Sequence, residues 1–209
     1  SIFDIRHRVV ANYVWDMPFF KNSSGFLANV LGNWRYNGII AFQTGAHWQP
    51  FISTAPKLTG TCTQAGVGAG LCINTGGDYN LDGNRNDRPN STISNFSPSK
   101  ADWTVGWFNN GVPNPFSSPC LGCVGNLHRN SFVGPSYTDF DMSLFKILKF
   151  GERVNIEFRA EAFNIFNHTN FQLPGANNAG HNKINNSAFG EAGGAFDPRE
   201  LQFGLKFAF

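Results

Sequence analysis

The last ten residues limit the possible folds more than any other stretch of the chain. In residues 200–209, ELQFGLKFAF, large apolar side chains alternate with polar or small ones. This period of two is that of a β-strand with one apolar face. Such a strand is an aggregation hazard at the edge of a soluble sheet, whereas lipid covers it in a closed membrane barrel. The apolar positions of this terminal strand are Leu201, Phe203, Leu205, Phe207 and Phe209.

Four other segments share this alternation and predict four more strands. They span residues 7–17, 33–45, 137–150 and 153–163, and in the last of them apolar residues alternate with Arg, Asn and Glu. A charged face opposite an apolar one suits a polar interior and a lipid exterior. The pattern blurs at Lys146, which predicts either a β-bulge or a lysine that reaches toward the membrane rim. The predicted fold class is therefore all-β, an antiparallel transmembrane β-barrel segment with long extracellular loops.

The connectors between these strands alternate between short and long. Short ones lie near residues 18–30 and 150–152, and long ones lie at 46–136 and 164–198. Bacterial barrels have short turns in the periplasm and long loops outside the cell. We therefore expect Phe209 at the periplasmic end of its strand.

Five strands are too few for a closed barrel, because the smallest bacterial barrels have about eight. Further short strands could lie at 47–53 and 103–108. Otherwise the chain is the C-terminal part of a larger barrel, which a start without Met or signal peptide favours. In that interpretation residues 1–209 belong to one barrel domain. It contains a long extracellular loop region at 46–136, and its last three strands, with one long loop, at 137–209.

Six segments of the chain resemble, in the same order, the C-terminal barrel region of Oar-like TonB-dependent receptors, which are large outer-membrane proteins. The segments FRAEAFNIFNHTNF and GNLHRNSFVGP are the more specific ones. The six are DIRHRVVANYVWDMPF, GNWRYNGIIAFQTG, GDYNLDGNRNDRPN, GNLHRNSFVGPSYTDFDMSLFK, FRAEAFNIFNHTNF and LQFGLKFAF.

This resemblance implies a barrel of about twenty-two strands, placed in the bacterial outer membrane and completed by a plug domain and a TonB box. Neither of these two parts is visible in the sequence. The family imports scarce, bulky ligands, and the resemblance does not say which one. It also implies four partners: outer-membrane lipid, the barrel-assembly machinery that reads the terminal strand, the remainder of the receptor, and TonB through that remainder.

Residues 78–87, DYNLDGNRND, predict a calcium loop. Oxygen-bearing side chains at alternate positions are followed by Gly83, as in loops that wrap a hard cation. Pro89 stands where such loops have a bidentate Glu, so only weak binding is expected, and an Asx-rich turn is the alternative. The candidate calcium ligands are Asp78, Asn80, Asp82, Asn84, Asn86 and Asp87.

The four cysteines, Cys62, Cys72, Cys120 and Cys123, all lie in the irregular middle of the chain. An even number of cysteines in loop-like sequence favours disulfides and an oxidising compartment. A zinc site fits less well because the first pair is too widely spaced, and a redox CxxC would open a helix in a βαβ unit. We predict two local disulfides, 62–72 and 120–123.

No catalytic, nucleotide-binding or histidine metal motif occurs, so the chain is not predicted to be an enzyme. Glu157 and Glu161 would lie about 13 Å apart along a strand, too far for a glycosidase pair. They fit better in a ladder of charges facing the barrel interior. The predicted cross-strand partners in that ladder are Asp139 and Asp141 with Arg153 and Arg159. The net charge of +2 gives no reason to expect a nucleic-acid partner.

Two questions stay open in the sequence. The loop aromatics Trp48, Trp103, Trp107 and Phe108 could stack on a ligand or pack together in a loop core. The chain could also be a self-contained outer-membrane or surface protein with an adhesive or structural role. A secreted carbohydrate-binding β-sandwich is the third alternative, because its strands would show the same alternation.

Overall fold

The computed structural model describes residues 4–20, 25–53, 77–93, 98–106, 113–151 and 154–209. The chain forms two compact units, which we name the sheet unit and the loop unit. The sheet unit comprises Arg6–Thr44, Ser136–Asn170 and Phe196–Phe209. The loop unit comprises Ser1–Ile5, Gly45–Pro135 and Phe171–Ala195.

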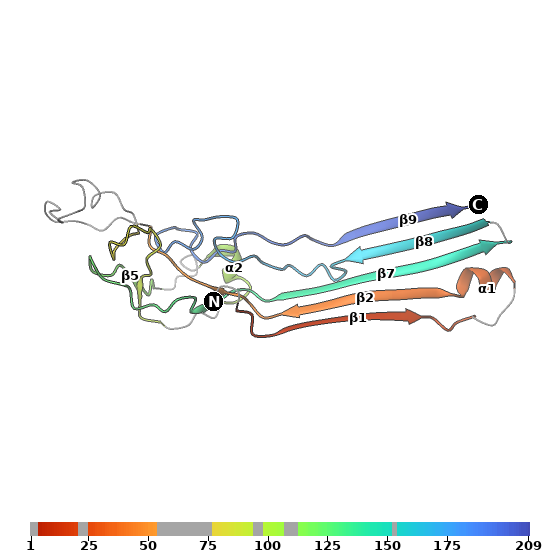
Figure 1. Cartoon of the computed structure of the whole chain (residues 1–209), viewed down its shortest axis with the longest axis horizontal. Helices are drawn as coiled ribbons and strands as arrows, with labels where there is room; N and C mark the ends of the chain where they lie inside the picture. Colours follow the sequence, from red (N-terminus) through yellow and green to blue (C-terminus); the bar gives the residue numbers. More distant parts are fainter. Residues whose placement is uncertain (1–3, 21–24, 54–76, 94–97, 107–112, 152–153) are drawn as a thin grey trace. The chain divides into compact units, whose positions relative to one another are not determined.

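The sheet unit contains one antiparallel sheet of five strands in the order β1-β2-β7-β8-β9 (Figure 1). The five predicted strands are thereby confirmed, and so is the all-β fold class. The sheet is not closed among the described residues. The strands are β1 (Arg8–Asp16), β2 (Trp34–Gln43), β7 (Tyr137–Phe150), β8 (Val154–Phe163) and β9 (Glu200–Ala208).

A β-bulge near Lys146 was one of the two predictions for β7. The observed register of β7 runs through this position without interruption. Phe145 lies opposite Arg35 on one side and Arg159 on the other, and Lys146 lies opposite Trp34 and Phe158. No residue is left over in either ladder, so the bulge prediction is wrong.

The strand pairing places both short connectors at one end of the sheet and both long connections at the other. Gln43 lies opposite Tyr137, and Phe163 lies opposite Glu200, so the long connections leave from the same end. One short connector holds helix α1 (Phe26–Leu31), and the other turns at Gly151, whose φ of 66° favours glycine. We refer to these ends as the short-connector end and the long-connector end.

The loop unit is built from short elements. Strand β3 (His47–Trp48) pairs with β6 (Phe132–Val133), and β4 (Asn90–Ser91) pairs with β5 (Phe116–Ser117). The possible strand at 47–53 is thus present only in its first two residues, because Pro50 has no N–H to continue a ladder.

The second possible strand, at 103–108, is contradicted, because α2 (Asp102–Val105) is a helical turn. The carboxylate of Asp102 accepts hydrogen bonds from the backbone N–H and the hydroxyl of Ser99, at 2.6 and 2.8 Å. This Ser-x-x-Asp arrangement is a helix-start signal that overrides the apolar alternation. None of the described helices is long and apolar enough to cross a membrane.

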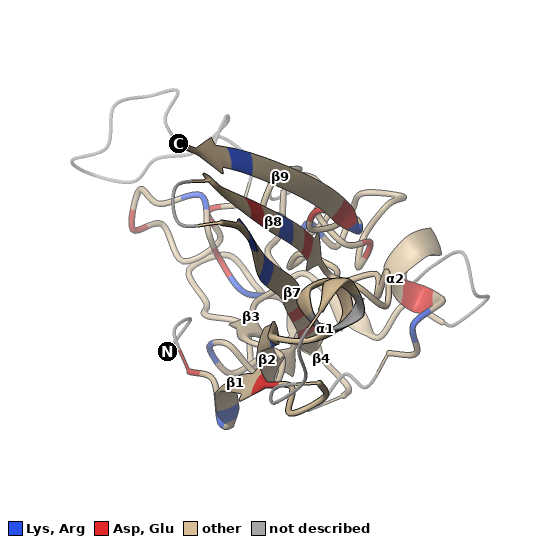
Figure 2. Ribbon diagram, turned by 90° about the vertical axis from the view of Figure 1, so that its right-hand side faces the viewer, with Lys and Arg blue, Asp and Glu red and all other residues tan. Residues whose placement is uncertain are grey.

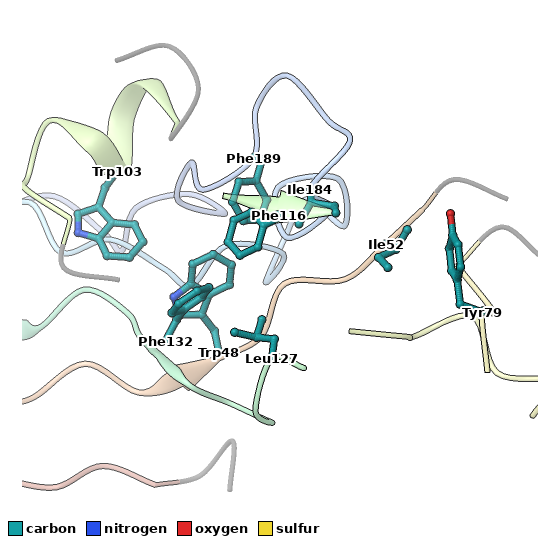
Figure 3. Packing of buried hydrophobic residues seen from close by; sticks show 9 residues of the cluster. All are labelled: Trp48, Ile52, Tyr79, Trp103, Phe116, Leu127, Phe132, Ile184 and Phe189. Atoms are coloured by element: carbon teal, nitrogen blue, oxygen red, sulfur yellow. The ribbon is translucent and has the colours of Figure 1, made fainter. Parts of the chain in front are cut away.

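Nine buried residues, among those that the structure describes, give the loop unit a hydrophobic core of its own (Figure 3). The rings of Trp48 and Phe132, directly opposite in β3 and β6, lie 5.6 Å apart, and Phe116 and Phe189 pack beside them. Trp103 is buried in the same core, so the core-packing alternative is confirmed for Trp48 and Trp103. Trp107 and Phe108 lie outside the described residues. The core consists of Trp48, Ile52, Tyr79, Trp103, Phe116, Leu127, Phe132, Ile184 and Phe189.

Candidate functional site

The sheet presents one continuous apolar face. Directly opposite residues of antiparallel strands point to the same side, and the four registers match apolar positions across all five strands. Phe203 is 71% exposed at the centre of β9, so this face lacks cover among the described residues. The apolar face consists of Val9, Ala11, Tyr13, Trp15, Trp34, Tyr36, Gly38, Ile40, Phe42, Thr138, Phe140, Met142, Leu144, Lys146, Leu148, Phe150, Val154, Ile156, Phe158, Ala160, Ala162, Leu201, Phe203, Leu205 and Phe207.

Lys146 is the one charged member of the apolar face as defined, and its ammonium group has specific partners. It donates a hydrogen bond to the carbonyl of Gly32, just beyond the short-connector end of β2. It also lies 5.1 Å from the centre of the Trp34 ring, in a cation–π contact. The lysine therefore reaches toward the short-connector end of the sheet, and a place for its ammonium group at the membrane rim stays a prediction.

The opposite side, the polar face, carries most of the charges of the five strands. Figure 2 shows acidic and basic residues following one another along β8. Arg159 lies 3.2 Å from Glu157 and 4.0 Å from Glu161, while Arg35 pairs with Asp16 at 2.6 Å. The polar face consists of Arg8, Val10, Asn12, Val14, Asp16, Arg35, Asn37, Ile39, Ala41, Gln43, Tyr137, Asp139, Asp141, Ser143, Phe145, Ile147, Lys149, Asn155, Glu157, Arg159, Glu161, Phe163, Glu200, Gln202, Gly204, Lys206 and Ala208.

The predicted pairing of Asp139 and Asp141 with Arg153 and Arg159 is wrong for Arg159. The register places Phe145 opposite Arg159, so that arginine pairs along its own strand instead. Asp139 accepts a hydrogen bond from the Tyr137 hydroxyl, and Asp141 accepts one from the backbone N–H of Asn164. Arg153 lies outside the described residues.

Two hollows lie at opposite ends of the sheet and differ in charge. The hollow at the long-connector end has a volume of about 320 Å³ and is lined by Asp139, Asp141 and Glu200, among others. The hollow at the short-connector end has a volume of about 470 Å³, and its charged lining residues are Asp16, Arg35 and Lys149. The long-connector end is therefore lined by several carboxylates, and the short-connector end by the Arg35–Asp16 ion pair and the further cation Lys149.

The decisive comparison is with protein-family models: the model described as "Outer membrane beta barrel domain" matches residues 1–202. The chain belongs to this family. No curated protein and no solved structure matches the chain.

Family membership places this outer-membrane β-barrel domain in the bacterial outer membrane, as predicted. The same result excludes the secreted β-sandwich, whose apolar strand faces would have to be buried against each other. The exposed apolar face agrees with this exclusion, because no second sheet covers it among the described residues.

In this barrel domain the predicted calcium loop is a compact turn held by its own side chains. The carboxylate of Asp78 accepts hydrogen bonds from the backbone N–H groups of Asp82 and Gly83, at 3.1 and 3.0 Å. Asp87 accepts bonds from the N–H groups of Tyr79 and Asn80, at 2.5 and 2.8 Å. Both carboxylates are buried. The loop therefore has the hydrogen bonding of an Asx-rich turn, whether or not it also binds a cation.

Asp82 is the exposed carboxylate of this loop. The backbone N–H of Asn84 and the side-chain amide of Asn80 donate hydrogen bonds to it, and these hold the pKa of Asp82 below its ordinary value. Within the described part of the chain, no group of three or more His, Cys, Asp or Glu side chains is arranged to hold a metal ion. A calcium ion would therefore need amide and backbone oxygens as well, including those of Asn80, Asn84 and Asn86.

Calcium binding stays a prediction, and titration tests it. If the loop binds calcium, isothermal titration should give a heat, and calcium at ten times the dissociation constant should stabilise the folded protein by about 1.4 kcal/mol. Asp78→Asn should remove both effects. A titration without heat and without thermal stabilisation would contradict the prediction.

We predict that Asp87→Ala destabilises the loop unit by about 2–3 kcal/mol, because two backbone N–H groups lose their charged acceptor. The loss should be measurable as a lower urea midpoint for proteolysis of the loop unit. The matched control is Asn86→Ala, which changes the exposed neighbouring residue and should stay within about 0.5 kcal/mol. Equal losses for the two variants would contradict the role given to Asp87.

One of the two predicted disulfides is confirmed, because Cys120 and Cys123 are bonded. The turn that it closes contacts the Asx-rich loop: the backbone N–H of Gly122 donates to the carbonyl of Tyr79, at 2.7 Å. Cys62 and Cys72 lie outside the described residues.

Sequence reasoning missed the contacts that join the first short connector to the apolar face. The indole N–H of Trp34 donates to the carbonyl of Val30 in α1, at 3.2 Å, and Lys146 donates to Gly32. The sequence contained one signal for them: a lysine within a run of apolar positions needs a polar partner close by.

Proposed function

We propose that this chain forms part of the wall of an Oar-like TonB-dependent outer-membrane receptor that takes up a bulky ligand. The observation that supports this most directly is the segregation of the sheet into an apolar face and a charged face over all five strands. A barrel wall has lipid on one side and a polar interior on the other. Strands β1 and β9 each pair with a single neighbour among the described residues, and a barrel needs about eight strands or more. Further strands of the same receptor would complete the wall.

The connectors support an orientation. In bacterial barrels short turns lie in the periplasm and long loops lie outside the cell. The short-connector end would then be periplasmic, and the loop unit extracellular. A loop unit with its own core and a disulfide suits ligand recognition, because it presents its surface on a rigid frame.

The proposed partners follow from this placement. Lipid would cover the apolar face, and the barrel-assembly machinery would read Leu201, Phe203, Leu205, Phe207 and Phe209 in the terminal strand. The plug and the TonB box would come from the remainder of the receptor, and TonB would supply energy through them. We propose transport without catalysis, since the charged groups of the polar face form ion pairs and hydrogen bonds rather than an acid–base pair at a reacting centre.

The sequence of the complete gene, followed by a binding measurement, tests this function. We expect a plug domain and a TonB box upstream of residue 1, and we expect the full-length protein to bind the purified periplasmic domain of TonB. Deletion of the TonB box should abolish that binding and leave the barrel in the membrane. A signal peptide directly before Ser1 would instead favour the self-contained adhesive or structural protein.

A further inference from the structure

Four large apolar side chains are exposed in the connector between β1 and β2. Phe19, Phe20, Phe26 and Leu31 are 57, 49, 75 and 47% exposed. Single exposed apolar residues are ordinary, whereas several in one short connector indicate a surface that something else covers.

The first of these residues continues the apolar face beyond the end of β1. The ring of Phe19 meets the ring of Trp15 edge-on, with 6.4 Å between the ring centres. Trp15 belongs to the apolar face, opposite Tyr36. The connector thus leaves the strand in contact with the apolar face.

The last residues of the connector accept hydrogen bonds from side chains of the same face. Trp34 donates its indole N–H to the carbonyl of Val30, and Lys146 donates to the carbonyl of Gly32. Trp34 and Lys146 lie directly opposite each other in β2 and β7. Both ends of the connector are therefore joined to residues of the apolar face.

These two hydrogen bonds also satisfy the backbone carbonyls of Val30 and Gly32. Leaving these carbonyls unpaired would be energetically costly in a region poor in water. The last carbonyls of a helix have no partner within it, and a helix as short as α1 has few internal bonds. Here side chains of the neighbouring strands supply donors for carbonyls at its C-terminal end. Trp and Lys are also the residues that commonly fix a protein at the boundary between lipid and water.

We propose that Phe19, Phe20, Phe26 and Leu31 form an interfacial anchor, which inserts these four exposed apolar side chains into the phospholipid surface at the short-connector end of the barrel. Its partner is phospholipid at the boundary between headgroups and acyl chains, the depth at which amphipathic surface helices lie. Continuity with the apolar face favours lipid over a protein partner. The inference rests on the proposed function in one respect, namely that the apolar face contacts lipid.

Tryptophan quenching by brominated phospholipid tests the proposal on the full-length protein in vesicles. Phe26→Trp adds a reporter to the connector, Phe203→Trp adds one to the centre of the apolar face, and Leu121→Trp adds one to an exposed site of the loop unit. Emission is compared with that of the parent protein in lipids brominated either near the headgroup or near the middle of the chains. Should Phe26→Trp not fold, Leu31→Trp replaces it.

We expect the tryptophan at residue 26 to lose severalfold more emission than the one at residue 121, and to lose most with bromine near the headgroup. The tryptophan at residue 203 should lose most with bromine in the middle of the chains. Quenching at residue 203 but not at residue 26 would overturn the anchor and leave the lipid-facing barrel intact; a blue-shifted emission at residue 26 would then assign the connector to a protein partner. An absence of quenching at both residues would contradict the lipid contact of the apolar face, and the anchor with it.

Discussion

Replacing Phe132 by Ala is expected to lower the free energy of unfolding of the loop unit by about 3–5 kcal/mol. The ring is 1% exposed and lies 5.6 Å from Trp48 and 6.0 Å from Phe116, measured between ring centres. Trp48 and Phe132 are the paired residues of β3 and β6, so a cavity at residue 132 also weakens the contact between these two strands. In the described part of the loop unit no regular element is longer than four residues, and the strands there are too short to compensate.

Limited proteolysis of the membrane-embedded protein at increasing urea concentration measures this loss. Cleavage within the loop unit reports its opening, while the sheet remains protected. The matched control is Val133→Ala in the same strand, whose side chain is 38% exposed and should cost less than about 1 kcal/mol. Equal sensitivity of the two variants would show that the loop unit does not depend on this core.

The five long strands were predictable because each carries its own signal. The period of two is local, and in β9 it runs without interruption from Leu201 to Phe207. The strand pairing agrees with these local predictions, because the predicted apolar faces of all five strands lie on the same side of the sheet. The disulfide between Cys120 and Cys123 was predictable for the same reason, because their spacing is a local property.

The core of the loop unit was not predictable, because its members come from distant parts of the chain. Trp48, Phe116, Phe132 and Phe189 meet through contacts between segments that share no periodicity. A composition rich in Gly, Asn and Pro indicated loops, but it gave no information about which aromatic residues would pack together. The helical turn at Asp102 was predictable in principle from the Ser-x-x-Asp signal beginning at Ser99.

The pairing partners of the charged residues depend on the register between neighbouring strands, which the sequence alone does not specify. A shift of one residue between β7 and β8 would exchange the two faces. The observed register puts Phe145 opposite Arg159, so the expected aspartate partner is absent and the two flanking glutamates take its place. Similarly, Lys146 finds its acceptor at Gly32, 114 residues earlier in the chain.

The sharpest test of the two faces is a pair of lysine substitutions at adjacent residues of β9. Phe203→Lys is expected to destabilise the membrane-inserted protein by about 2–4 kcal/mol, the cost of a lysine near the bilayer midplane on a barrel exterior. Phe203 lies opposite Ala160 on the apolar face, whose described members include no carboxylate for the new ammonium group. Gln202→Lys places the same charge one residue earlier, opposite Glu161 on the polar face. That variant should be neutral within about 0.5 kcal/mol, because the added lysine faces water and a carboxylate.

Urea titration of the protein folded into phospholipid vesicles measures both variants, with the electrophoretic shift between folded and heat-denatured barrel as the readout. Both substitutions introduce the same lysine into the same strand, so the contributions of the lysine itself and of the edge position largely cancel. The expected result is a loss for Phe203→Lys that exceeds the loss for Gln202→Lys by at least 1.4 kcal/mol, or about tenfold in the folding equilibrium. The reverse order would place the polar face against lipid and would contradict the assignment of both faces. Equal losses would remove the lipid contact on which the proposed function and the interfacial anchor both depend.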